Sequence, residues 1–145
     1  MLAIFIVLVI LSAFFSSLET ALFHLKSYSG VNKTVKDLLE NPKQLLASLL
    51  TGNTIVNIGL ASIAASYTLI LYNNKFFSHM SLSIALLIEV IVVTIIILVF
   101  GEVLPKTYAI SKSEKLANIS AKILKIALKI IYPITFIVYN TTKFI

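Results

Sequence analysis

The chain has 145 residues, 59% of them hydrophobic, and its mean hydropathy is +1.00. This composition indicates an integral membrane protein made of one membrane domain, with no room for a sizeable soluble one. There are no cysteines, which excludes disulfides, thiolate metal sites and a cysteine nucleophile. The net charge of +6 comes from lysine without arginine, and in so apolar a chain it indicates lipid headgroups and topology rather than nucleic acid.

The first predicted membrane span covers about residues 2–23. It is apolar from Leu2 and has no basic stretch or clear cleavage site, so we expect a retained helix rather than a signal peptide. Ser12 and Ser16 share one helical face, and Glu19 follows three residues later. This stripe of two hydroxyls and a carboxylate indicates an ion site, whereas isolated serines usually pack closely or bond to their own helix.

The second predicted span covers about residues 45–72 and contains no charged residue. It is longer than the roughly 20 residues that cross a bilayer, so we expect it to tilt, break or project. Asn53 and Asn57 are four residues apart and must point away from lipid. Two interpretations stay open, a hydrogen bond between helices and a contribution to an ion site.

The third predicted span covers about residues 82–104, and Glu102 lies near its end. A carboxylate inside a membrane needs a cation, a proton or a hydrogen-bond donor as its partner. Pro105 has no N–H group, so it cannot bond to the carbonyl of Gly101 four residues earlier. A carboxylate beside a free carbonyl is the beginning of a site for a hard cation.

Glu89 lies in the same span, about 20 Å from Glu102 along a helix. Three interpretations are open: a protonated carboxyl, a carboxyl paired with a hydroxyl or an amide, and a place on an ion path. Together the spans offer only oxygen ligands, which favour Mg²⁺, Ca²⁺, Mn²⁺ or Na⁺ over zinc or copper. His24 and His79, near span ends, are interpreted as interfacial residues.

The segment from Ser113 to about residue 142 has a different pattern. Lysines and isoleucines recur there at spacings of three and four, which predicts a basic amphipathic helix in the membrane interface. Pro133 is expected to break it, and a fourth span over residues 116–139 is disfavoured by its lysines. Lysines also crowd the loop between the first two spans, which predicts that this loop and the tail face the cytoplasm and the N-terminus lies outside.

Four segments in this order resemble the transmembrane domain of the CorC/CNNM (cyclin M) family, and they cover essentially the whole chain. The segments are LSAFFSSLETA (residues 11–21), NPKQLLA (41–47), GNTIVN (52–57) and FGEVLPKT (100–107). Bacterial members of the family often carry Gly-Ser at positions 17 and 18, where this chain has Ser17 and Leu18. No hydroxyl is therefore available at position 18.

The resemblance implies an all-α homodimer with three spans per protomer and a juxtamembrane helical belt on the cytoplasmic side. It implies a largely dehydrated Mg²⁺ near the membrane centre, Na⁺-coupled exchange, and regulatory CBS domains that normally follow and are absent from this chain. The family's ion ligands fall on five residues of this sequence, namely Ser12, Ser16, Asn53, Gly101 through its carbonyl, and Glu102. Outer-shell or ion-path roles are assigned to Glu19, Asn57, Glu89 and Pro105.

Together with these residues, the resemblance implies a Mg²⁺ exporter of the cell membrane that uses Na⁺. Two alternatives remain: a membrane anchor or ion sensor that regulates other transporters, and the same scaffold with specificity for Na⁺ or Mn²⁺. An enzyme is not expected, because no nucleophile–base pair, phosphate loop or metal-hydrolase spacing is present.

Overall fold

The computed structural model describes residues 1–25, 30–74, 76 and 79–142, with side chains up to residue 136. Helices make up almost all of this part of the chain, and no strand occurs in it. The elements in chain order are α1 (Leu2–His24), α2 (Lys33–Leu39), α3 (Pro42–Asn73), α4 (Leu82–Ile96), η2 (Ile97–Val103), α5 (Leu104–Ser111) and α6 (Ser113–Thr142).

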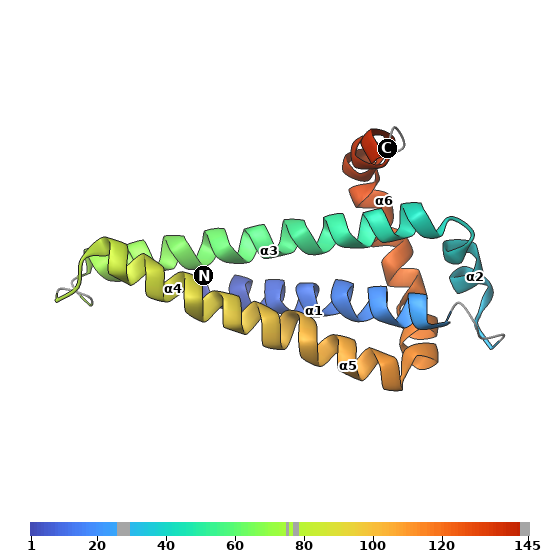
Figure 1. The fold of residues 1–145 in the computed structure, drawn as a ribbon, viewed down its shortest axis with the longest axis horizontal. Helices are drawn as coiled ribbons and strands as arrows, with labels where there is room; N and C mark the ends of the chain where they lie inside the picture. Colours follow the sequence, from blue (N-terminus) through green and yellow to red (C-terminus); the bar gives the residue numbers. More distant parts are fainter. Residues whose placement is uncertain (26–29, 75, 77–78, 143–145) are drawn as a thin grey trace.

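Within the described residues, three helical segments are long and apolar enough to cross a membrane. They are α1, α3 and the run formed by α4, η2 and α5, and they lie side by side in Figure 1. This confirms the three predicted spans. The 32 residues of α3 form an unbroken helix, about 48 Å long at 1.5 Å per residue. That exceeds the roughly 30 Å hydrocarbon core, so α3 must tilt or project rather than break.

Local sequence signals explain where several helices begin. The side chain of Asn32 accepts a hydrogen bond from the backbone N–H of Val35 and caps α2, a short helix that the sequence analysis did not predict. Ser81 caps α4 in the same way, and Pro42 occupies the first position of α3, where a missing N–H costs nothing. Lys26 and Lys75, which entered the topology prediction, lie outside the described residues.

The third span contains a seven-residue π-helix, η2, just before Pro105. The backbone N–H of Leu104 there donates to the carbonyl of Val99, five residues earlier. In a regular α-helix the ring of Pro105 would clash with the carbonyl of Gly101, and the wider turn relieves that clash. The π-helix therefore places Gly101 and Glu102 differently from the straight α-helix that the sequence pattern alone suggests.

Helix α6 crosses the spans at the end of the bundle where α1 ends and α3 begins (Figure 1). Its buried face is formed by Ala117, Ala121 and Leu124, which pack into the same core as α1 and α3. The predicted break at Pro133 is wrong, because α6 continues through it as one helix. It changes direction instead, since a proline inside a helix kinks it (Figure 1).

The core lies at this same end of the bundle. Large side chains of α1, such as Phe15 and Leu18, belong to one buried cluster with Leu49 and Leu60 of α3. Gly52 lets the two helices approach closely, because a Cβ atom there would lie 2.8 Å from Cε1 of Phe15. Close packing around small residues is how membrane helices associate without a hydrophobic driving force between them. It fixes α1 against α3 next to the polar residues described below.

Candidate ion-binding site

Polar side chains of α1 and α3 meet at Ser12, which is fully buried. The Ser12 hydroxyl lies 3.1 Å from Oδ1 of Asn53 and 2.8 Å from Oδ1 of Asn57. A hydroxyl carries one proton, so it satisfies only one of these two acceptors at a time. Three oxygen atoms with a single proton among them form a cluster that a cation would complete.

The third span adds a charge to this cluster through Glu102. The amide nitrogen of Asn57 donates to Oε1 of Glu102 at 3.4 Å, so Asn57 connects Ser12 on α1 with the carboxylate on η2. Asn57 was predicted only for an outer-shell or ion-path role. The structure places it between two of the predicted ligands, where its oxygen faces Ser12 and its nitrogen faces Glu102.

Gly101 determines how closely η2 approaches α1. A Cβ atom at this position would lie 2.8 Å from Oγ and 3.4 Å from Cβ of Ser12. Glycine is therefore required at this contact for steric reasons, in addition to the carbonyl role predicted for it. The backbone of η2 thus lies directly against the hydroxyl that joins the two asparagines.

Ser16 is also fully buried, and its hydroxyl has no hydrogen-bond partner among the described residues. Its neighbours on α1 behave differently: Ser17 and Thr20 donate to backbone carbonyls of their own helix, at 3.0 Å and 3.3 Å. Burying a hydroxyl without a partner costs about 1–3 kcal/mol, so such a group calls for an explanation. A ligand one helical turn from Ser12 would provide one.

Glu19, at the end of the predicted stripe, has a partner of its own. Its carboxylate lies 3.5 Å from Nζ of Lys106 on α5, and both side chains are partly exposed. This ion pair ties α1 to the third span and neutralises Glu19. Lys106 was not predicted as its partner, because nothing in the sequence shows that α5 returns to the end of α1.

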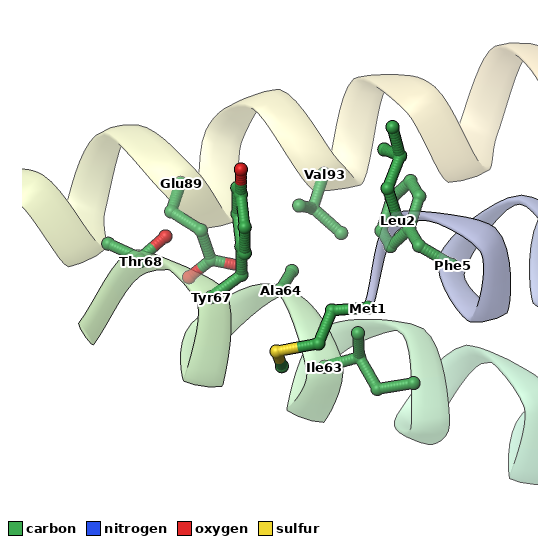
Figure 2. Close-up of a pocket in the computed structure, with 9 residues that line it drawn as sticks. All are labelled: Met1, Leu2, Phe5, Ile63, Ala64, Tyr67, Thr68, Glu89 and Val93. Atoms are coloured by element: carbon green, nitrogen blue, oxygen red, sulfur yellow. The ribbon is translucent and has the colours of Figure 1, made fainter. Parts of the chain in front are cut away.

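The two remaining predicted residues lie apart from the cluster. Pro105 follows the π-helix, and Glu89 lines a separate cavity with Thr68 (Figure 2). Within the described residues, no group of three or more His, Cys, Asp or Glu side chains could hold a metal ion. The cluster therefore combines one carboxylate with neutral oxygens, a ligand set that suits a hard cation.

The cyclin M transmembrane N-terminal domain model matches residues 3–145 of the chain. The chain belongs to this family. It is 35% identical over 97% of its length to a UPF0053 protein of Haemophilus influenzae. It is 30% identical over 92% to the UPF0053 inner membrane protein YfjD of Escherichia coli, and 26% identical over 99% to the UPF0053 protein YrkA of Bacillus subtilis.

The chain spans about a third of the length of these curated relatives, of which it covers 33%, 31% and 36%. The match to the family model identifies the chain as a transmembrane domain of the cyclin M type. The apolar helices and the inner membrane relative together identify an integral membrane protein.

Proposed function

We propose that the chain binds Mg²⁺ in the cluster between α1, α3 and η2 and exports it across the membrane in exchange for Na⁺. The observation that carries the proposal is the meeting of three spans at Ser12, where oxygens of α3 and a carboxylate of η2 come together. Intramembrane polar groups arranged in this way mark ion pathways by default. Family membership supports a divalent cation as the cargo.

Each side chain has a distinct part in this proposal. Glu102 supplies the negative charge, and Ser12, Ser16 and Asn53 supply neutral oxygens in place of water. The carbonyl of Gly101 completes the set, because its backbone lies against Ser12. Mg²⁺ gives up water reluctantly and demands near-octahedral oxygens at about 2.0–2.1 Å, so several ligands must act together. Asn57 holds Glu102 in place through its amide nitrogen.

Release of the ion requires a second arrangement of the same groups. The site contains a single carboxylate, so Na⁺ can compete for it without leaving excess negative charge in the membrane. A π-helix is a frequent feature of functional sites, and a return of η2 to α-helical geometry would turn Glu102 away from Ser12. Lysines crowd the α6 end, which supports a cytoplasmic position for that end, and the proposed export therefore runs toward the Met1 end.

The proposed assembly is a homodimer, with regulatory CBS domains after the membrane domain in the full protein. The greater length of the relatives is in keeping with such an extension. We further propose that the described helices form the transport unit and that α6, which packs on α1, α2 and α3, forms the belt around it.

Mg²⁺ flux from liposomes that contain the purified protein tests this proposal. We expect efflux driven by an opposing Na⁺ gradient, reduced at least tenfold by Glu102→Gln. The matched control is Glu40→Gln, which removes the same charge from an exposed residue outside the spans and should leave flux unchanged. Wild-type protein that binds Mg²⁺ but shows no flux would favour the anchor or sensor interpretation instead.

A further inference from the structure

A second carboxylate lies inside the third span, far from the cluster. Glu89 is thirteen residues before Glu102, about 20 Å along the helix. Within the described residues, no hydrogen bond or ion pair satisfies its side chain. Carboxylates at such positions are costly and need a partner. The surroundings of Glu89 show what kind of partner fits.

Glu89 lines two adjoining cavities of about 180 Å³ and 200 Å³, and Thr68 and Val93 line both. The first cavity lies between the beginning of α1, the second half of α3 and α4 (Figure 2). At about 30 Å³ per water molecule, 180 Å³ has room for roughly six waters. Most of its other walls are apolar, and its polar side chains are those of Glu89, Thr68 and Tyr67. The hydroxyl of Tyr67 lies away from the carboxylate of Glu89 (Figure 2).

The hydroxyl of Thr68 is the second observation. Thr68 is 7% exposed, and in the described part of the chain its hydroxyl forms no hydrogen bond. Four other hydroxyls of α3 donate to the carbonyl four residues earlier, namely those of Thr51, Thr54, Ser62 and Ser66. Thr68 instead turns its oxygen toward the cavity, on the same side as the carboxylate of Glu89 (Figure 2).

An apolar barrier separates this cavity from the cluster. Asn57, Leu60, Ala64 and Thr68 follow one another along a single stripe of α3. Leu60 is fully buried and Ala64 is 8% exposed, so both fill the space between the two polar regions. The cavity is therefore separate from the cluster and lies on its Met1 side.

We propose that Glu89 and Thr68 form a second cation station, which holds a divalent cation that keeps most of its water. Mg²⁺ is typically bound in proteins by one or two carboxylates while several waters remain. One carboxylate, one hydroxyl and a cavity for roughly six waters fit that mode. This inference rests on the proposed function, because the station would take the ion after it leaves the cluster at Ser12 and Glu102.

Counting bound Mn²⁺ on the purified protein by electron paramagnetic resonance tests the station, with Mn²⁺ as a paramagnetic substitute for Mg²⁺. We expect two Mn²⁺ per wild-type chain, one tight and one weak. Glu89→Gln should remove the weak site alone, and Glu102→Gln should remove the tight site alone. Thr68→Val should weaken the weak site about tenfold, as expected for the loss of roughly 1.4 kcal/mol. Thr54→Val, which removes an exposed hydroxyl of the same helix, is the matched control and should change neither site.

The outcomes separate this inference from the proposed function. One Mn²⁺ per wild-type chain, lost in Glu102→Gln and kept in Glu89→Gln, would overturn the station and leave the cluster intact. Loss of the weak site in Glu89→Gln with no effect of Glu102→Gln would support the station and contradict the cluster. Two sites that persist in both Glu89→Gln and Thr68→Val would overturn the station.

Discussion

Single residues of the cluster differ in what they do in the absence of an ion. The hydroxyl of Ser12 lies within hydrogen-bond distance of two amide oxygens, whereas the buried hydroxyl of Ser16 has no partner in the part of the chain that the structure describes. The energetic consequences of removing them therefore differ as well. Removing Ser12 breaks an interaction that joins α1 to α3. Removing the Ser16 hydroxyl breaks no hydrogen bond with the described residues, because it forms none with them.

Ser16→Ala therefore separates binding from stability. Without Mg²⁺ we expect no loss of thermal stability, because an unpartnered hydroxyl contributes only its burial cost of about 1–3 kcal/mol. Mg²⁺ affinity should fall about tenfold, as for the loss of one neutral ligand worth roughly 1.4 kcal/mol. Thermal unfolding in detergent and calorimetry measure the two quantities. A mutant that is less stable without Mg²⁺ would show that the hydroxyl has a structural role.

For single residues, the sequence predicted which side chains belong to the cluster better than it predicted the hydrogen bonds and ion pairs that they form. The spacing of Ser12 and Ser16 placed both on one face of α1, and the structure shows both fully buried. The bridging position of Asn57 and the pairing of Glu19 with Lys106 could not be predicted. Both depend on how the third span is turned relative to α1 and α3, which no local pattern specifies.

The element that turns the third span is the π-helix η2. It lies between the α-helical segments α4 and α5, and it brings Gly101 against Ser12. Pro105 was expected to free a carbonyl, and the sequence gives no sign that the backbone would accommodate the proline with a wider turn. For the same reason the continuity of α6 through Pro133 was missed, because packing on both sides of a proline decides between a kink and a break.

Gly101→Ala tests the contact between η2 and α1. The new Cβ would lie 2.8 Å from Oγ of Ser12, so one helix must move. We expect a loss of about 1–3 kcal/mol in unfolding free energy and a large drop in Mg²⁺ affinity. Gly59→Ala is the matched control, since its Cβ would meet Cδ1 of Leu8 at 3.4 Å, an ordinary contact. Denaturant titration and calorimetry that show equal effects of the two substitutions would contradict the account.

At the scale of the whole molecule, three spans and one crossing helix enclose a polar cluster between apolar surfaces. Hydropathy was enough to predict the spans, because each is a long apolar run. The lysine-rich face of α6 was enough to predict an interfacial helix, and the structure shows it crossing the bundle (Figure 1). The short helix α2 was not predicted, because seven residues are too few to show a clear periodic pattern of apolar residues.

The arrangement as a whole predicts that Mg²⁺ and Na⁺ compete for one set of oxygens. The cluster holds a single carboxylate, so it cannot compensate both ions at once inside the membrane. The proposed exchange therefore requires the two ions to occupy the site in turn. Substitution of either a charged or a neutral ligand should affect both ions together.

The most direct test is calorimetric titration of Mg²⁺ into the purified protein, with Na⁺ added in a second series. Wild type is compared with Asn53→Ala and Glu102→Gln, and with the control Glu40→Gln. We expect binding that Na⁺ weakens, that both cluster substitutions abolish and that the control leaves unchanged. Mg²⁺ binding of equal affinity in wild type, Asn53→Ala and Glu102→Gln would contradict the account.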